Sequence, residues 1–211
     1  MTREEPAAHG HEHHELPTSG RPLTGVAVSA TLHCLTGCAI GEVAGMAIGT
    51  AVGLDNWQTV ALSIALAFLF GYSLTSLPLL RAGLVLGSVV SIALASDTFS
   101  IATMEVVDNG VVLAIPGALD AGLGSLLFWG SLSFSLAVAF VAALPLNRWL
   151  IARGKGHAAV HRTGIHGGPN PRVVGAVLAV AFVFGAAVLL AEALDNGNGA
   201  QAAIVSHGAA L

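Results

Sequence analysis

Long runs of apolar residues alternate with short polar segments along most of the chain. A helix that crosses a bilayer needs about 20 mostly apolar residues. Four runs reach that length, at residues 23–52, 59–80, 122–151 and 173–194. A fifth run, residues 82–107, is long enough but contains Asp97 and Glu105. The pattern predicts an all-α polytopic transmembrane bundle of about five spans within residues 22–195.

The end of the fifth run is ambiguous. Asp108-Asn109-Gly110 form a turn-like signal. The apolar stretch 111–119 that follows is too short to cross a bilayer alone and contains Pro116-Gly117. Residues 98–119 therefore allow a helical continuation, a re-entrant piece, an interfacial segment or an extra span.

Charge favours five spans and excludes other classes of protein. Only 9% of the residues are charged, whereas a soluble domain carries about 25%. Eight basic against twelve acidic residues argue against nucleic-acid binding. With five spans and a cytoplasmic N-terminus, all eight basic residues fall on the inside, as the positive-inside rule expects. A sixth span would place the basic loop 148–172 outside. We therefore predict a multi-pass plasma-membrane protein whose main partner is the lipid bilayer.

Both ends of the chain are predicted to lie outside the bundle. Residues 1–21 lack the apolar core of a secretory signal and are rich in histidine, so we predict a disordered cytoplasmic tail. Short His-rich tracts can capture metal weakly, although a tail without function fits equally well. Residues 196–211 are predicted to form a short, poorly ordered extracytoplasmic tail.

Glycines recur at every fourth position of the first span. They are Gly37, Gly41, Gly45, Gly49 and Gly53. Small residues at this spacing let a neighbouring helix approach the backbone closely. The stripe predicts tight helix packing, and it offers a surface for a homo-oligomer.

Potential metal ligands share another face of the first span. Cys34, Cys38 and Glu42 are each four residues apart, and His33 lies at the edge of their face. Thiolate, imidazole and carboxylate groups are typical ligands of copper and zinc. A Cys-x₃-Cys spacing does not fit a thioredoxin-like redox pair. Buried cysteines also serve as small hydrophobic residues, so packing is the simpler alternative.

Acidic residues and a methionine follow one stripe of the third span. Asp97, Met104 and Asp108 project within about 40° of one another, with Glu105 about 60° further round. Carboxylates facing lipid would be costly, so we expect them to face the bundle interior or a water-filled cavity. Cation coordination and proton relay are both consistent with such a stripe. Simple solvation at the outer interface is the alternative for Glu105 and Asp108.

The loop after the fourth span carries basic residues and histidines. Its basic residues are explained by topology and contact with lipid headgroups. His157 and His161 are four residues apart and would share a face if the loop were helical, with His166 beyond. Such a pair can chelate a metal, although exposed pairs are common without one.

Several of these stretches carry a resemblance to a known family. They are His33-Cys34-Leu35-Thr36-Gly37-Cys38, Met104-Glu105, Asp108-Asn109, Pro116-Gly117, Pro145-Leu146-Asn147-Arg148 and Arg153-Gly154-Lys155-Gly156-His157. In these stretches the chain resembles the DUF4396 family of bacterial integral membrane proteins, over residues 32–161. The resemblance implies a membrane protein, and it implies neither an activity nor a set of site residues.

The hypothesis we favour is binding or transport of a transition-metal ion, copper or zinc. The predicted ligands are His33, Cys34, Cys38, Glu42, Met104, Glu105 and Asp108. They would form a ladder from the cytoplasmic half of the membrane to the outside, with sites weak enough to release the ion. One alternative is a proton-coupled or structural subunit. Another is a membrane redox or haem protein with His33 as an axial ligand. We favour a non-enzymatic role.

Overall fold

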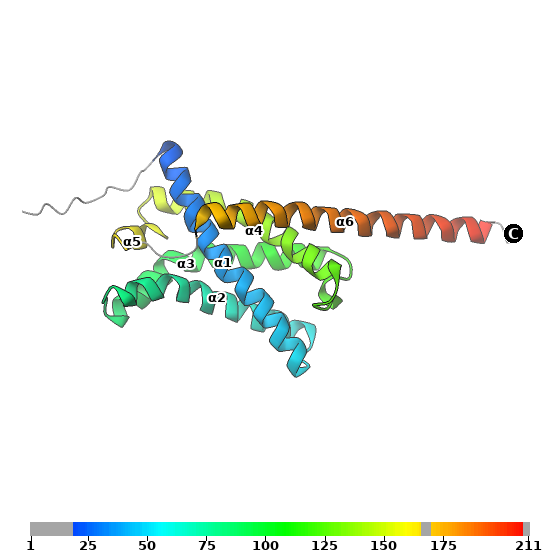
Figure 1. Ribbon diagram of the computed structural model, residues 1–211, viewed down its shortest axis with the longest axis horizontal. Coiled ribbons are helices and arrows are strands. Elements are labelled where there is room, and N and C mark those ends of the chain that lie inside the picture. Colours follow the sequence, from blue (N-terminus) through cyan, green and yellow to red (C-terminus); the bar gives the residue numbers. More distant parts are fainter. Residues whose placement is uncertain (1–18, 166–169, 209–211) are drawn as a thin grey trace, which may run out of the picture.

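The computed structural model describes residues 19–165 and 170–208, and this part of the chain is helical without strands (Figure 1). The long helices are α1 (Gly20–Val52), α2 (Asn56–Arg81), α3 (Leu86–Ala114), α4 (Leu126–Ala152) and α6 (Pro171–Gly208). Two short helices, η1 (Ala118–Asp120) and α5 (Ala158–His161), lie in the connections. Among the described residues, five helices are long and apolar enough to cross a membrane. The predicted all-α, multi-pass architecture is confirmed, whereas the side faced by the N-terminus stays a prediction.

Local sequence signals explain where the helices begin and end. The Asp55 carboxylate accepts a hydrogen bond from the Gln58 backbone N–H at 2.9 Å, and the Gln58 side chain accepts one from the Asp55 N–H at 3.2 Å. This reciprocal capping box satisfies two N–H groups that a helix start leaves unpaired. Gly53 ends α1 with a φ of 74°, a left-handed conformation that glycine adopts without a Cβ penalty. A tight turn therefore joins α1 to an antiparallel α2.

Helix α1 runs diagonally across the bundle and contacts α2, α3, α4 and α6 (Figure 1). Helix α6 packs on α4, and its C-terminal part projects beyond the other helices (Figure 1). Its side chains are mostly exposed, and they include Val173, Val177, Val180 and Val183. In a membrane these apolar side chains face lipid, where their exposure carries no hydrophobic cost.

Four glycines of the stripe lie against α2 of the same chain. A Cβ at Gly37, Gly41, Gly45 or Gly49 would come within 2.2–2.6 Å of an atom of α2. The α2 residues that they meet are Gly71, Ala67, Ser63 and Thr59. These four glycines are buried against α2 of the same chain, and the homo-oligomer stays a prediction. Gly53 differs from them, because a Cβ there would have no atom within 4 Å and the residue serves as the helix cap.

The third span is one continuous helix, and the turn predicted at Asp108-Asn109-Gly110 is wrong. All three residues lie inside α3. The Asp108 carboxylate accepts a hydrogen bond from the Ser135 hydroxyl at 2.5 Å, and the Asn109 amide donates to the Glu105 carbonyl at 2.9 Å. The Asp108 side chain thus bonds to α4, and the Asn109 amide bonds to a carbonyl of its own helix one turn earlier, so α3 continues.

Proline sets the end of this span. Helix α3 stops at Ala114, two residues before Pro116, and Gly117 then adopts a φ of 76°. Proline has no N–H to donate, and it disfavours helical geometry in the residue before it. The stretch 111–119 is thus divided between the last turn of α3 and η1, and it forms no extra crossing.

The bundle extends further at both ends than the sequence predicts. Gly20 and Arg21, which fall in the predicted tail, already belong to α1, and residues 1–18 lie outside the described residues. At the other end α6 continues to Gly208. The predicted extracytoplasmic C-terminal tail from residue 196 stays a prediction.

Candidate metal centre

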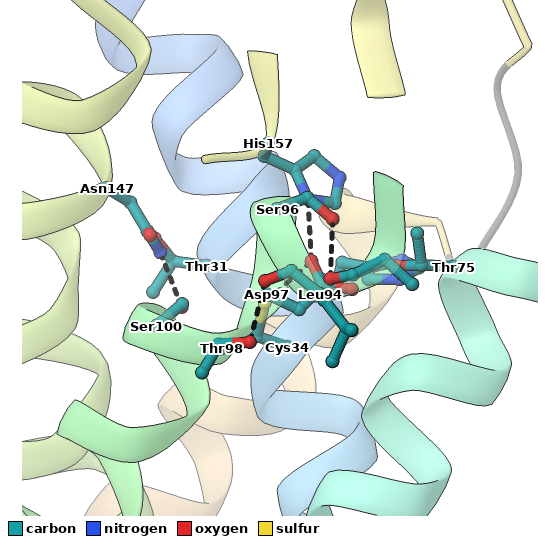
Figure 2. Close-up of polar contacts among 12 residues, drawn as sticks. Thr31, Cys34, Thr75, Leu94, Ser96, Asp97, Thr98, Ser100, Asn147 and His157 are labelled. Carbon is teal, nitrogen blue, oxygen red and sulfur yellow. Dashed lines mark hydrogen bonds and ion pairs between the residues drawn. The ribbon is translucent and has the colours of Figure 1, made fainter. Parts of the chain in front are cut away.

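Three potential metal ligands from separate parts of the chain meet inside the bundle (Figure 2). The Cys34 Sγ lies 3.8 Å from the Asp97 Oδ1, and the His157 Nδ1 lies 3.2 Å from the same oxygen. One ligand atom from each residue lies within 4.8 Å of the other two. We call Cys34, Asp97 and His157 the inner cluster.

Two helices and one loop bring the inner cluster together. Cys34 lies on α1 and is 1% exposed, and Asp97 lies on α3 and is 0% exposed. His157 comes from the loop after α4, where Gly154 and Gly156 have φ values of 66° and 59°. Residues other than glycine rarely adopt these backbone angles. The two glycines let the loop fold back onto the bundle and direct His157 toward Asp97.

One oxygen of Asp97 has no hydrogen-bond partner. Its Oδ1 contacts Cys34 and His157, but its Oδ2 is buried and unpartnered among the residues that the structure describes. Buried polar groups in proteins nearly always have a partner, and an isolated buried carboxylate is costly. A cation bound by the inner cluster would satisfy this oxygen.

His33 borders the inner cluster. Its ring centroid lies 5.2 Å from that of His157, and its Nε2 lies 3.0 Å from the Thr75 hydroxyl. The His161 ring also lies 5.8 Å from that of His157. His157 therefore has an imidazole neighbour from α1 and one from its own loop.

A polar network braces the helices beside the inner cluster (Figure 2). The Asn147 side-chain amide on α4 donates to the Thr31 hydroxyl on α1 and to the Ser100 hydroxyl on α3, both at 2.9 Å. All three residues are buried. Because Thr31 lies three residues before Cys34 and Ser100 three residues after Asp97, this network fixes the helices that carry both ligands.

A second group of acidic side chains lies further along α1 and α3. Glu42 interacts with Glu105, and Glu105 also faces the Cys38 thiol. Asp108 lies next to Glu105 and is hydrogen-bonded to Ser135. We call Cys38, Glu42, Glu105 and Asp108 the outer cluster. From Asp97 to Asp108 the rise of α3 is about 16 Å, so the two clusters occupy different depths of the bundle.

The outer cluster borders a small cavity of about 40 Å³. Glu42, Asp108, Asn109, Ser63 and Ser131 contribute its polar lining. The Glu42 Oε1 is buried and has no hydrogen-bond partner within the described part of the chain. A cavity of about 10–15 Å³ holds one water, so this cavity has room for water between the carboxyl groups.

The predicted metal ligands therefore divide into separate groups. Cys34 joins the inner cluster, with His33 beside it, whereas Cys38, Glu42, Glu105 and Asp108 form the outer cluster. Met104 is fully buried in the apolar core that includes both cysteines. The sequence-based ligand set omits Asp97 and His157, although both residues carry recognisable ligand groups. His166 and the histidines of the N-terminal tail lie outside the described residues.

Family comparison covers most of the bundle. The family model described as "Domain of unknown function (DUF4396)" matches residues 25–156. The chain belongs to this family. The DUF4396 region runs from α1 to the loop after α4 and includes Cys34 and Asp97, and it ends one residue before His157. The resemblance predicted from sequence is confirmed. No curated protein and no solved structure matches the chain.

The inner cluster of this DUF4396 protein contains ligand groups of the types that zinc binds. Zinc binds cysteine sulfur at about 2.3 Å and histidine nitrogen or carboxylate oxygen at about 2.0–2.2 Å. In a tetrahedral site such bonds hold the ligand atoms about 3.3–3.8 Å apart. The distances of 3.2 and 3.8 Å at Asp97 are close to that range. The Cys34 and His157 ligand atoms lie within 4.8 Å of each other, so the three side chains would have to move together to surround one ion.

Proposed function

We propose that this protein binds a transition-metal ion, copper or zinc, within the membrane and serves its transport. The observation that carries the proposal is the inner cluster, where thiol, carboxyl and imidazole groups from three segments meet around a buried, unpartnered carboxylate oxygen. Ionisable residues inside a membrane are costly and usually serve a function. Thiol, carboxyl and imidazole groups can all coordinate the same transition-metal ion.

The outer cluster supports transport rather than binding alone. It lies on the same two helices as the inner cluster and contains one thiol and three carboxyl groups. A conducting pathway needs successive sites, each weak enough to release the ion. The inner cluster would hold the ion more tightly, and the outer cluster would be a weaker site at a different depth, from which the ion is released.

Metal analysis of the full-length protein in detergent tests the proposal. After loading with zinc or copper and removal of excess metal, we expect Cys34→Ala to contain about one metal ion per chain less than the wild type. Cys38→Ala is the comparison variant, because Cys38 is an equally buried α1 cysteine outside the inner cluster, and the weaker outer cluster would lose its ion when excess metal is removed. The N-terminal histidines are present in all three proteins, so any metal that they bind adds equally to each metal content and does not affect the differences. Equal metal contents in three folded proteins would contradict the proposal.

Proton movement through the outer cluster is a second candidate function. It is favoured by the cavity beside Glu42 and Asp108 and by the unpartnered Glu42 Oε1. Carboxyl groups that face one another across water can pass a proton along a hydrogen-bonded chain. Such a role would use Glu105 as the central group, since it interacts with Glu42, Cys38 and Asp108.

Proteoliposomes containing a pH-sensitive dye distinguish the two functions. If protons move without metal, we expect metal-free flux in the wild type and its reduction to the rate of protein-free vesicles in Glu105→Gln. Asp55→Asn is the control, because Asp55 is an exposed helix cap and asparagine caps equally well. Flux that requires added zinc or copper would favour metal transport, and no flux under either condition would exclude the proton function.

A further inference from the structure

We infer, building on the proposed function, that the ion of the inner cluster is a divalent cation of the zinc class rather than Cu(I), and that His33 is its fourth ligand. Cys34, Asp97 and His157 supply the other three ligands.

The donor atoms favour a divalent ion. Cu(I) prefers soft sulfur ligands, whereas zinc accepts sulfur, nitrogen and oxygen ligands together. The inner cluster offers one sulfur beside a carboxylate oxygen and an imidazole nitrogen. The second cysteine, Cys38, lies one helical turn from Cys34 on α1 and faces Glu105. Met104 packs in the apolar core. The additional sulfur atoms that would select Cu(I) therefore lie outside the inner cluster.

Charge balance points the same way. A cysteine thiolate and a carboxylate together carry two negative charges, which a divalent cation neutralises. With a monovalent cation one negative charge would remain in a site where Cys34 and Asp97 are buried. Within residues 19–165 and 170–208, no lysine or arginine makes a hydrogen bond or ion pair with the three side chains. An uncompensated buried charge is strongly unfavourable.

His33 borders the inner cluster and would complete a tetrahedral site after a side-chain shift, because it lies outside the 4.8 Å group formed by the other three ligands. It precedes Cys34 on α1, is 7% exposed, and has its ring 5.2 Å from that of His157. Histidines that bind metals usually donate their other ring N–H to a neighbouring oxygen, which orients the ring. The Thr75 hydroxyl is such an oxygen, 3.0 Å from the His33 Nε2. With Nε2–H donated to Thr75, the unprotonated Nδ1 is left to bind the ion.

Cobalt(II) is the probe that tests this inference, because it replaces zinc and reports its ligands in the visible spectrum. Thiolate ligation gives a charge-transfer band, and tetrahedral geometry gives intense d–d bands. The chain has two cysteines and neither lies in the His-rich tail, so the tail cannot produce the charge-transfer band. We expect the full-length wild type to show both features, and Cys34→Ala to lose the charge-transfer band.

The fourth ligand is tested by His33→Gln, which keeps a hydrogen-bonding group for Thr75 but removes the imidazole. We expect its charge-transfer band to persist, its d–d intensity to fall, and cobalt binding to weaken at least about tenfold. An unchanged d–d spectrum in the folded variant would overturn the role of His33. The melting temperature of the metal-free protein, compared with that of the wild type, shows that the variant is folded.

Competition identifies the class of ion. We expect zinc to bleach the cobalt spectrum, and Cu(I), kept reduced with ascorbate and buffered by a Cu(I) chelator, to leave it unchanged. If Cu(I) displaced cobalt and bound in a Cys34-dependent manner while zinc did not, the divalent assignment would fail but the proposed metal function would stand. If no metal gave a Cys34-dependent signal, both would fail.

Discussion

Replacing Gly41 with valine is expected to destabilise the folded protein by about 3 kcal/mol or more, at the upper end of the range for overpacked sites. A Cβ at Gly41 would lie 2.2 Å from the backbone nitrogen and 2.3 Å from the Cα of Ala67 on α2. Backbone atoms cannot rotate away as a side chain can, so α1 and α2 would have to separate. Equilibrium unfolding by SDS titration, followed by circular dichroism, measures the change.

Gly25→Val is the matched control for this prediction. Gly25 lies on the same helix, and a Cβ there would have no atom within 4 Å. Surface substitutions of this kind usually change stability by less than about 0.5 kcal/mol. Equal stabilities of the two variants would show that the glycine stripe does not hold α1 against α2.

The architecture follows from the sequence because lipid restricts the choices. A membrane crossing must be a helix of minimum length, so the apolar runs predict where the spans lie, although α3 and α6 extend beyond the predicted ends at residues 107 and 194. The sequence-based prediction is wrong where polar residues that indicate a turn in a soluble protein lie within a membrane helix. Asp108-Asn109-Gly110 signal a turn in a soluble protein, but in α3 the Asp108 side chain bonds to Ser135 of α4, the Asn109 amide bonds to a carbonyl of α3, and the helix continues.

Only part of the candidate site can be predicted from the sequence. The fourfold spacing correctly places Cys34, Cys38 and Glu42 on one face of α1, because helix geometry fixes that relation. Which residue of α3 meets each of them depends on how the helices tilt and slide, and no local pattern encodes this. Cys34 meets Asp97, 63 positions away, and the second cysteine meets Glu105 instead.

His157 lies in different surroundings from those that its sequence neighbours suggest. The basic residues beside it indicate an exposed cytoplasmic loop, and its spacing from His161 indicates a pair on one helical face. The structure has a single helical turn there, and the loop folds against the bundle through Gly156, where a Cβ would lie 3.1 Å from the Leu150 Cβ. The closely spaced Gly154 and Gly156 are the one local signal for such a reversal.

Asp97→Asn is expected to weaken zinc binding at least about 100-fold while changing the stability of the metal-free protein little. Asparagine has the shape of aspartate, and its oxygen can still accept the contacts from Cys34 and His157. Its amide nitrogen carries no negative charge and cannot serve as a metal ligand. Zinc at 100 times the wild-type Kd should stabilise the wild type by about 2.7 kcal/mol, and this variant by about 0.4 kcal/mol.

Asp108→Asn is the control that separates the two clusters. Asp108 is buried on the same helix, and asparagine can still accept the hydrogen bond from Ser135. We expect this variant to keep the full zinc stabilisation, measured as the difference between unfolding with and without the metal. The opposite pattern, with stabilisation lost in Asp108→Asn and kept in Asp97→Asn, would move the principal metal site to the outer cluster. Glu42, with its unpartnered oxygen, would then be the first residue to substitute.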